Sequence, residues 1–279
     1  MVLEIAGFIA LGLAIGTIGT LIGAGGGFIL LPVLALLNPL EPTGTLTATS
    51  LAVVAANATS GTIAYRRQGR VDVRSGALFA LAALPGSIAG VLLARTIPRG
   101  PFDIAFALVL LALALVVVRV RPNTRPAAPV GRVDHPWGRV SRELTDSDGQ
   151  IHRYTVELPL GVALSFVIGF ASSLLGIGGG FIHVPALIAL LGFPVHIATA
   201  TSHFVLAITT SIGTVTHILA GDLNTTWPRT VAIAAGAVCG AQIGASLSRR
   251  VRGVLIMRLL ALALVIVALR LAAQGLLGV

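Results

Sequence analysis

Apolar residues of this chain run in long stretches that are separated by short polar ones. Stretches near ~20 residues without charge are long enough to cross the hydrocarbon core of a membrane as helices. The pattern therefore predicts an all-α polytopic membrane protein. The segments expected to be helical cover about residues 3–22, 27–38, 45–65, 75–95 and 102–120, and then 158–176, 180–192, 195–219, 229–248 and 254–276.

The two sets of segments share a glycine-rich motif at equivalent places. Residues 23–29 and 176–182 both read Gly-x-Gly-Gly-Gly-Phe-Ile, and a proline follows three residues later in each. Further on, Ala48-Thr49-Ser50 matches Ala200-Thr201-Ser202 in the same order. The late segment of each half carries Gly-x-x-x-Gly. Self-similarity at a near-constant offset indicates an internal repeat.

Arginine positions predict how the two halves are oriented. Arginines gather between the third and fourth segments, in the central stretch, and between the last two segments. Basic loops stay on the cytoplasmic side of a membrane. Under that rule the first half begins outside and the second begins inside, so the repeats are inverted, as in secondary transporters with a site at the midplane.

The second segment of each half is short. About 12 residues span roughly 18 Å as a helix, which is too little for a ~30 Å hydrocarbon core. We expect the first two segments of each half to form a broken, re-entrant helical hairpin, followed by about three spanning helices; loop charge by itself does not distinguish this from two full crossings. The expected division is a first membrane repeat at 1–120, a central insert at 121–157 and a second repeat at 158–279.

The central insert differs from the rest of the chain. It opens with a Pro-rich linker at 121–126. Residues 139–144 and 151–156 then flank an Asp-Gly turn, which predicts a small cytoplasmic β-hairpin. A lone two-stranded hairpin is marginal in water, so we expect a homodimer through residues 138–156. The alternative is an arginine-rich loop lying near anionic lipid.

Composition supports a membrane protein. Hydrophobic residues make up 56% of the chain and charged residues only 10%, against roughly a quarter in a soluble domain. The net charge of +9 lies in the loops, where the positive-inside rule explains it without a nucleic-acid partner. The expected partners are the lipid bilayer and a small anion.

The glycine runs predict an anion site without a basic side chain. Three adjacent glycines disfavour helix, so the backbone unwinds and bares N–H groups. The helix that starts after each break, at Phe28 or Phe181, directs its positive dipole end at the break. Hydroxyl and amide groups of the following segments add donors suited to an oxyanion. The candidate substrate-binding residues are Gly25, Gly26, Gly27, Thr49, Ser50, Asn57, Gly178, Gly179, Gly180, Thr201, Ser202 and His203.

His203 breaks the symmetry of the repeat, because its counterpart is Leu51. Such a difference beside the site is where substrate specificity or proton coupling could lie. A histidine at this place equally serves as a hydrogen-bonding residue between helices.

Other classes are less consistent with the sequence. The segments hold no carboxylate pair, and the zinc-protease motif His-Glu-x-x-His is absent, so we expect no metal, no cofactor and no catalytic residue. An intramembrane enzyme stays open only as a remote alternative. A passive anion channel would use much the same features as a carrier.

The doubled glycine motif and the Ala-Thr-Ser repeats resemble the TauE/SafE family of membrane permeases. The likeness covers both membrane halves and excludes the stretch 121–157. It implies transport, commonly outward, of sulfite, thiosulfate, sulfoacetate and related organosulfonates across the bacterial inner membrane. The resemblance supplies this substrate class; the residues alone predict only an anion.

Overall fold

The fold is described from a computed structural model. It places residues 2–38, 40–94, 96–97 and 138–252, with single positions in 108–115 and 254–269. The fifth expected segment of each half, at 102–120 and 254–276, falls largely outside these described residues, and the linker at 121–126 falls wholly outside them.

The described residues form two matching sets of helices. The first set is α1 (Val2–Ile22), α2 (Gly27–Leu37), α3 (Thr43–Arg67) and α4 (Val73–Ala94). The second set is α6 (Leu158–Leu174), α7 (Gly180–Ala189), α8 (Val195–Leu219) and α9 (Trp227–Ser248). By length and composition, four stretches could cross a membrane: Leu3–Ile22, Val73–Ala94, Val195–Leu219 and Trp227–Ser248. The predicted all-α polytopic membrane fold is confirmed.

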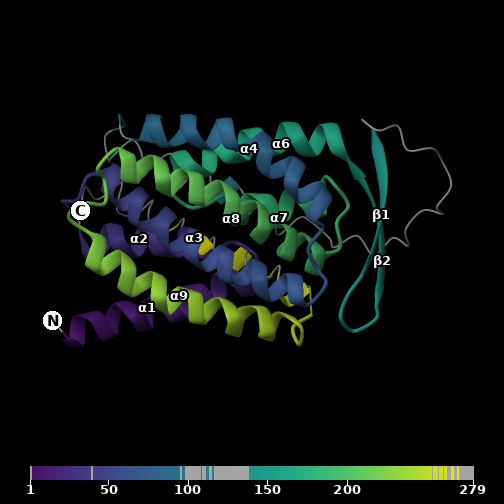
Figure 1. The fold of residues 1–279 in the computed structure, drawn as a ribbon, viewed down its shortest axis with the longest axis horizontal. Helices are drawn as coiled ribbons and strands as arrows, with labels where there is room; N and C mark the ends of the chain where they lie inside the picture. Colours follow the sequence, from purple (N-terminus) through teal and green to yellow (C-terminus); the bar gives the residue numbers. More distant parts are fainter. Residues whose placement is uncertain are drawn as a thin grey trace.

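The helices pack in pairs that combine the two halves. In Figure 1, α1 lies along α9 at one side, α4 lies along α6 at the other, and α3 and α8 pack together between them. In the repeat, α1 corresponds to α6 and α9 corresponds to α4, so the pair α1–α9 is equivalent to the pair α6–α4. The arrangement therefore has a pseudo-two-fold axis that passes between α3 and α8.

The two halves are inverted with respect to each other. α3 ends beside the β-hairpin, where the N–H of Ser147 donates to the carbonyl of Gln68 at 2.9 Å. α8 instead begins there, just after Phe193, whose ring lies 4.8 Å from the ring of Tyr154. Equivalent helices thus run in opposite directions, as the loop charges predict.

The first two helices of each half form a hairpin with the glycine break at its tip. α2 returns along α1, so that Ile15, Leu30 and Leu34 share one buried apolar cluster. α7 returns along α6 in the same way, with Ser165 3.4 Å from His183. α2 has 11 residues, about 16 Å of helix, or roughly half of the hydrocarbon core. This is the predicted broken, re-entrant geometry.

Two antiparallel strands, β1 (Arg139–Thr145) and β2 (Ile151–Glu157), form the predicted hairpin, paired from Arg139 with Glu157 to Thr145 with Ile151. The hairpin docks on the end of its own helical bundle, because Tyr154 and Val156 belong to the main apolar core. The Tyr154 hydroxyl donates to Asp72 at 2.9 Å. Burial and the Asp72 carboxylate raise the pKa of this hydroxyl above its ordinary value.

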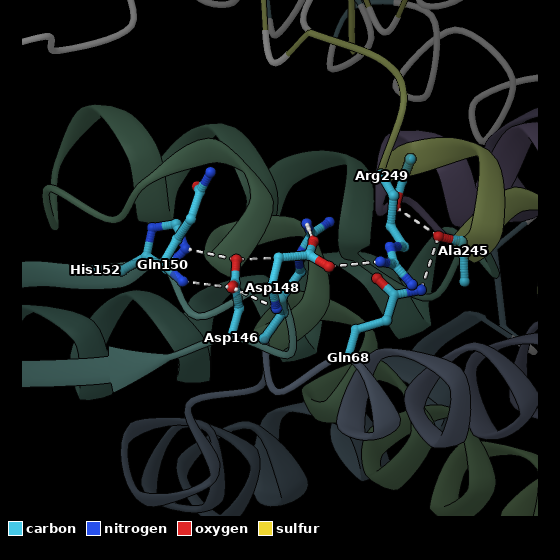
Figure 2. Close-up of polar contacts among 9 residues, drawn as sticks. Gln68, Asp146, Asp148, Gln150, His152, Ala245 and Arg249 are labelled. Atoms are coloured by element: carbon cyan, nitrogen blue, oxygen red, sulfur yellow. Dashed lines mark hydrogen bonds and ion pairs between the residues drawn. The ribbon is translucent and has the colours of Figure 1, made fainter.

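The turn of the hairpin holds both halves of the bundle through charged groups (Figure 2). Asp148 forms ion pairs with Arg249, which follows α9, and with Arg70, which follows α3. Asp146 lies beside them and accepts hydrogen bonds from His152 and from the N–H groups of Asp148 and Gln150, each at 3.0 Å. Burial raises the pKa of Asp146, but these hydrogen bonds outweigh it and hold the pKa below its ordinary value.

Candidate functional site

Each glycine run interrupts the helix with three left-handed residues. The φ angles are +85°, +74° and +84° at Gly23, Gly25 and Gly26, and +65°, +84° and +73° at Gly176, Gly178 and Gly179. Side chains of L-residues rarely adopt this region, so only glycine passes through it without strain. The helices stop and restart where the motif predicts.

The two breaks touch each other at the pseudo-two-fold axis. A Cβ atom added to Gly27 would lie 2.3 Å from the carbonyl oxygen of Ile177, and one on Gly180 would lie 2.6 Å from that of Gly23. The rings of Phe28 and Phe181 stack across the same axis, with centroids 6.2 Å apart. The structure therefore brings together the predicted glycines of both repeats.

The breaks expose backbone donors toward this contact. The N–H groups of Gly26, Gly27 and Phe28 donate to no other described residue, and the same holds for Gly178, Gly179, Gly180 and Phe181. These groups start α2 and α7, where the helix dipole adds partial positive charge. Unpaired N–H groups at such a place are suited to an anion.

The first hydroxyl of each Thr-Ser pair faces away from the breaks. Thr49 donates to the Thr226 hydroxyl at 3.3 Å, and Thr201 accepts from the N–H of Asp72 at 3.0 Å. Thr226 precedes α9 and Asp72 precedes α4. Both threonines therefore contact the start of a neighbouring helix, and the structure does not place them beside the glycine amides.

The second hydroxyl of each pair is placed differently in the two halves. Ser202 donates to the carbonyl of Gly23 at 3.3 Å and so contacts the first break. Its counterpart Ser50 is fully buried, and its hydroxyl has no hydrogen-bond partner among the described residues.

Two threonines that the sequence analysis did not select touch the breaks. A Cβ on Gly176 would meet Thr47, and one on Gly23 would meet Thr199. Residues two positions apart are rotated by about 200° around the helix axis, so Thr47 and Thr49 lie on nearly opposite faces. Both halves carry Thr-Ala-Thr-Ser, but the sequence does not say which threonine contacts a break. The packing of α3 and α8 shows that Thr47 and Thr199 do.

His203 and Asn57 are joined to the first break through Thr20. The Nε2 atom of His203 lies 3.2 Å from the Thr20 hydroxyl, which donates to Asn57 at 3.2 Å. The Asn57 amide then donates to the carbonyl of Gly25 at 3.1 Å. The edge of the Tyr65 ring packs on His203. Both predicted residues therefore lie at the break. Thr20, which was not among the predicted residues, connects them.

Asp222, His217 and Thr47 form a row of polar contacts that resembles a catalytic triad. His217 Nδ1 lies 2.7 Å from Asp222, and its Nε2 lies 3.4 Å from the Thr47 hydroxyl. That hydroxyl donates to the carbonyl of Gly44 at 3.0 Å, so its proton is not directed at the histidine. Thr47 is not set up as a nucleophile. Within the described part of the chain, no group of three His, Cys, Asp or Glu residues is placed to hold a metal ion.

These features define a class of protein: a polytopic helical membrane protein of two inverted halves whose broken helices meet at its centre. A family model described as "Sulfite exporter TauE/SafE" matches residues 8–271. The chain belongs to the TauE/SafE family.

Curated relatives have consistent names. A "Probable membrane transporter protein YunE" of Bacillus subtilis (strain 168) is 30% identical over 273 residues, which cover 96% of this chain and 97% of the relative. A "Probable membrane transporter protein" of Xylella fastidiosa (strain 9a5c) is 26% identical over 231 residues, 82% of this chain and 79% of the relative. No solved structure matches the chain. These names indicate a membrane transporter rather than an enzyme.

Proposed function

We propose that this protein is a secondary transporter that exports sulfur-containing oxyanions, such as sulfite, sulfoacetate or other organosulfonates. The substrate class rests on the family, and the anion preference rests on the site. The observation that carries the proposal is the pair of glycine breaks that press together with unpaired N–H groups on both sides.

Backbone donors without a fixed cation suit a carrier. The residues that touch the breaks in the described structure include no arginine or carboxylate; they are glycines, hydroxyl residues, Asn57, His203 and apolar side chains. An anion held only by dipoles and hydrogen bonds is bound weakly and can leave on either side. A site built around a buried arginine would hold it more strongly.

The pairing of the helices supports alternating access. Each re-entrant hairpin is packed on the last described helix of the other half, α1 on α9 and α6 on α4. Rocking of these two units about the α3–α8 contact would open the breaks first to one side and then to the other, as in other inverted-repeat carriers.

We further propose that the β-hairpin side faces the cytoplasm of a bacterial inner membrane. Arginines gather on the hairpin side, at the end of α3, at the start of α4 and just after α9 (Arg66, Arg67, Arg70, Arg74, Arg249 and Arg250). This is the distribution that the positive-inside rule associates with the cytoplasmic face.

Valine in place of Gly26 or Gly179 tests the site. A Cβ there would lie 2.6 Å from Ile15 or 2.7 Å from Ser172, at a φ that valine does not tolerate. We expect both variants to insert into the membrane and to lose counterflow of sulfite or sulfoacetate in proteoliposomes. Gly7→Val is the matched control, since a Cβ at Gly7 meets nothing within 4 Å.

Full flux in both break variants would refute the site. Flux that neither saturates nor shows counterflow in the wild type would instead identify a passive channel built on the same breaks.

A further inference from the structure

One difference between the two glycine breaks is the equivalent pair Gly19 in α1 and Ser172 in α6. A Cβ added to Gly19 would lie 2.3 Å from the nitrogen of Gly26, so α1 presses directly on the first break. The N–H of Gly25 also donates to the Gly19 carbonyl at 3.1 Å. At the second break the serine side chain occupies this place, and the N–H of Gly178 donates to no described residue.

A small cavity lies beside the second break. Its volume is about 10 Å³, which is enough for roughly one water molecule. Gly178 and Gly179 line it together with the polar side chains Ser165, Ser172, His183 and Thr209, and the rest of its wall is apolar (Ala83, Ile168, Val205 and Leu206).

At the first break, the positions equivalent to Ser165 and His183 carry no polar side chain. The counterparts of Ser165 and His183 are Gly12 and Leu30. Leu30 is fully buried and packs with Ile15. The first break, which Asn57 and Ser202 contact, therefore has no histidine at the position of His183.

The hydroxyls of this cavity donate to carbonyls of their own helices. Ser165 donates to Gly161 at 2.7 Å, and Ser172 and Thr209 each donate to a carbonyl three or four residues earlier at 3.1 Å. Their oxygens are thus left to accept hydrogen bonds. The Nε2 atom of His183 lies 3.4 Å from the Ser165 hydroxyl. Since that hydroxyl already donates to Gly161, the proton of this contact belongs to Nε2.

This assignment makes Nδ1 of His183 the unprotonated nitrogen. Nδ1 is buried and has no hydrogen-bond partner in the described part of the chain, and the side chain is only 3% exposed. A bare imidazole lone pair repels an anion that enters the cavity. A proton on Nδ1 converts it into a charge-assisted donor beside the amides of Gly178 and Gly179.

We propose that this cavity at the second break is the anion subsite of the transporter, and that an anion binds there together with one proton taken up on His183 Nδ1. The inference rests on the proposed function and adds to it the place of the anion and the coupling ion. The cavity widens to admit the sulfonate group when the two units move apart.

Other ionisable groups on the surrounding helices lie outside the cavity. α6 carries none, and α7 carries only His183. α4 contributes Arg74 at its start, and α8 contributes His196, His203 and His217. None of these four lines the cavity, so proton uptake there is assigned to His183.

Calorimetric titration of the detergent-purified full chain with methanesulfonate tests the proposal. This probe keeps its charge at neutral and mildly acidic pH, so protons taken up on binding enter the protein. Repeating the titration in two buffers of different ionisation enthalpy counts them. We expect about one proton for the wild type at a pH where His183 is neutral, and none for His183→Gln, with affinity lower by roughly tenfold, the effect of losing one charge-assisted hydrogen bond.

Two further variants keep the result interpretable. His217→Gln removes another buried histidine and should keep the proton uptake. Ser172→Gly installs the residue of the first break, lets α6 approach Gly179, and should weaken methanesulfonate binding by roughly tenfold through loss of the cavity.

The outcomes separate the two proposals. Binding without proton uptake in the wild type, or uptake that persists in His183→Gln, overturns the inference and leaves the transporter proposal standing. A wild-type protein that neither binds nor transports sulfonates or sulfite overturns the proposed function and this inference with it.

Discussion

Single residues decide how each glycine break is used. Gly19 lets α1 lie on the first break, and the second break has Ser172 in the same place, together with a small cavity that His183 lines. Because protein interiors are closely packed, one extra side chain at a contact of this kind changes what fits beside it. The two breaks therefore have the same backbone conformation but different side chains around them.

Asp146 is the residue whose ionisation holds the turn of the β-hairpin together, because its hydrogen-bond partners Asp148, Gln150 and His152 all belong to the hairpin. Its pKa is held below the ordinary value, so its contribution to stability is present above the unfolded-state pKa and is lost as the pH falls through the folded-state pKa. Asp146→Asn should lower the melting temperature at neutral pH by roughly 2–4 °C, as a loss of about 1 kcal/mol would.

Thermal unfolding in detergent across acidic pH checks this. The difference between wild type and Asp146→Asn should shrink to nothing at the acid end, where Asp146 is protonated. Asp148→Asn serves as the comparison, because its carboxylate is 41% exposed and its ion pairs are more screened by solvent. A difference that is constant with pH would contradict the assignment.

At the level of elements, close helix pairs join the two halves. Small residues let α1 approach α9 and α6 approach α4 so closely that a Cβ added to one of their glycines would clash with the backbone of the other helix. A Cβ at Gly16 would lie 2.6 Å from the carbonyl oxygen of Ala237. These contacts make each re-entrant hairpin part of a unit with the opposite repeat.

Gly16→Val should separate α1 from α9 and destabilise the fold, because the valine side chain meets backbone that cannot rotate away. We expect loss of the monodisperse peak in size-exclusion chromatography after detergent extraction. Gly7→Val, on the same helix but in open space, should behave as wild type. Equal behaviour of the two variants would show that the close α1–α9 contact is not required.

For the whole molecule, the hairpin joins the repeats within one chain. Through Asp148 it contacts Arg70 of the first half and Arg249 of the second. Among the described residues, each of its strands pairs only with the other, so each keeps one edge unpaired there. The homodimer expected through residues 138–156 remains a prediction, since these edges are able to pair with a second copy.

Deleting residues 138–156 should shift the detergent-solubilised particle from dimer to monomer mass, measured by light scattering coupled to chromatography. A dimer mass that survives the deletion would place the interface elsewhere.

Most of the fold could be predicted from the sequence. Apolar segment lengths gave the membrane helices, and the repeated glycines gave the breaks at Gly23–Gly26 and Gly176–Gly179, because both depend on local chain chemistry. Loop arginines gave the inverted orientation. The strands of the hairpin were placed to within one residue at their ends.

The site was only partly predictable, because the face that a helical residue presents depends on packing. The glycine amides, His203, Asn57 and Ser202 lie at the breaks, whereas Thr49 and Thr201 contact neighbouring helix starts. Thr20 and His183 were not among the residues selected from the sequence, since their surroundings depend on how the helices pack.

The sequence by itself determined where the chain unwinds and which elements repeat, since three adjacent glycines disfavour helix in any context. Only the tertiary structure decided that the two breaks press on each other, that α1 pairs with α9 rather than with its own half, and that His203 reaches the first break through Thr20. Those outcomes depend on contacts between residues more than 100 positions apart, such as Gly27 with Ile177, and no local pattern encodes them.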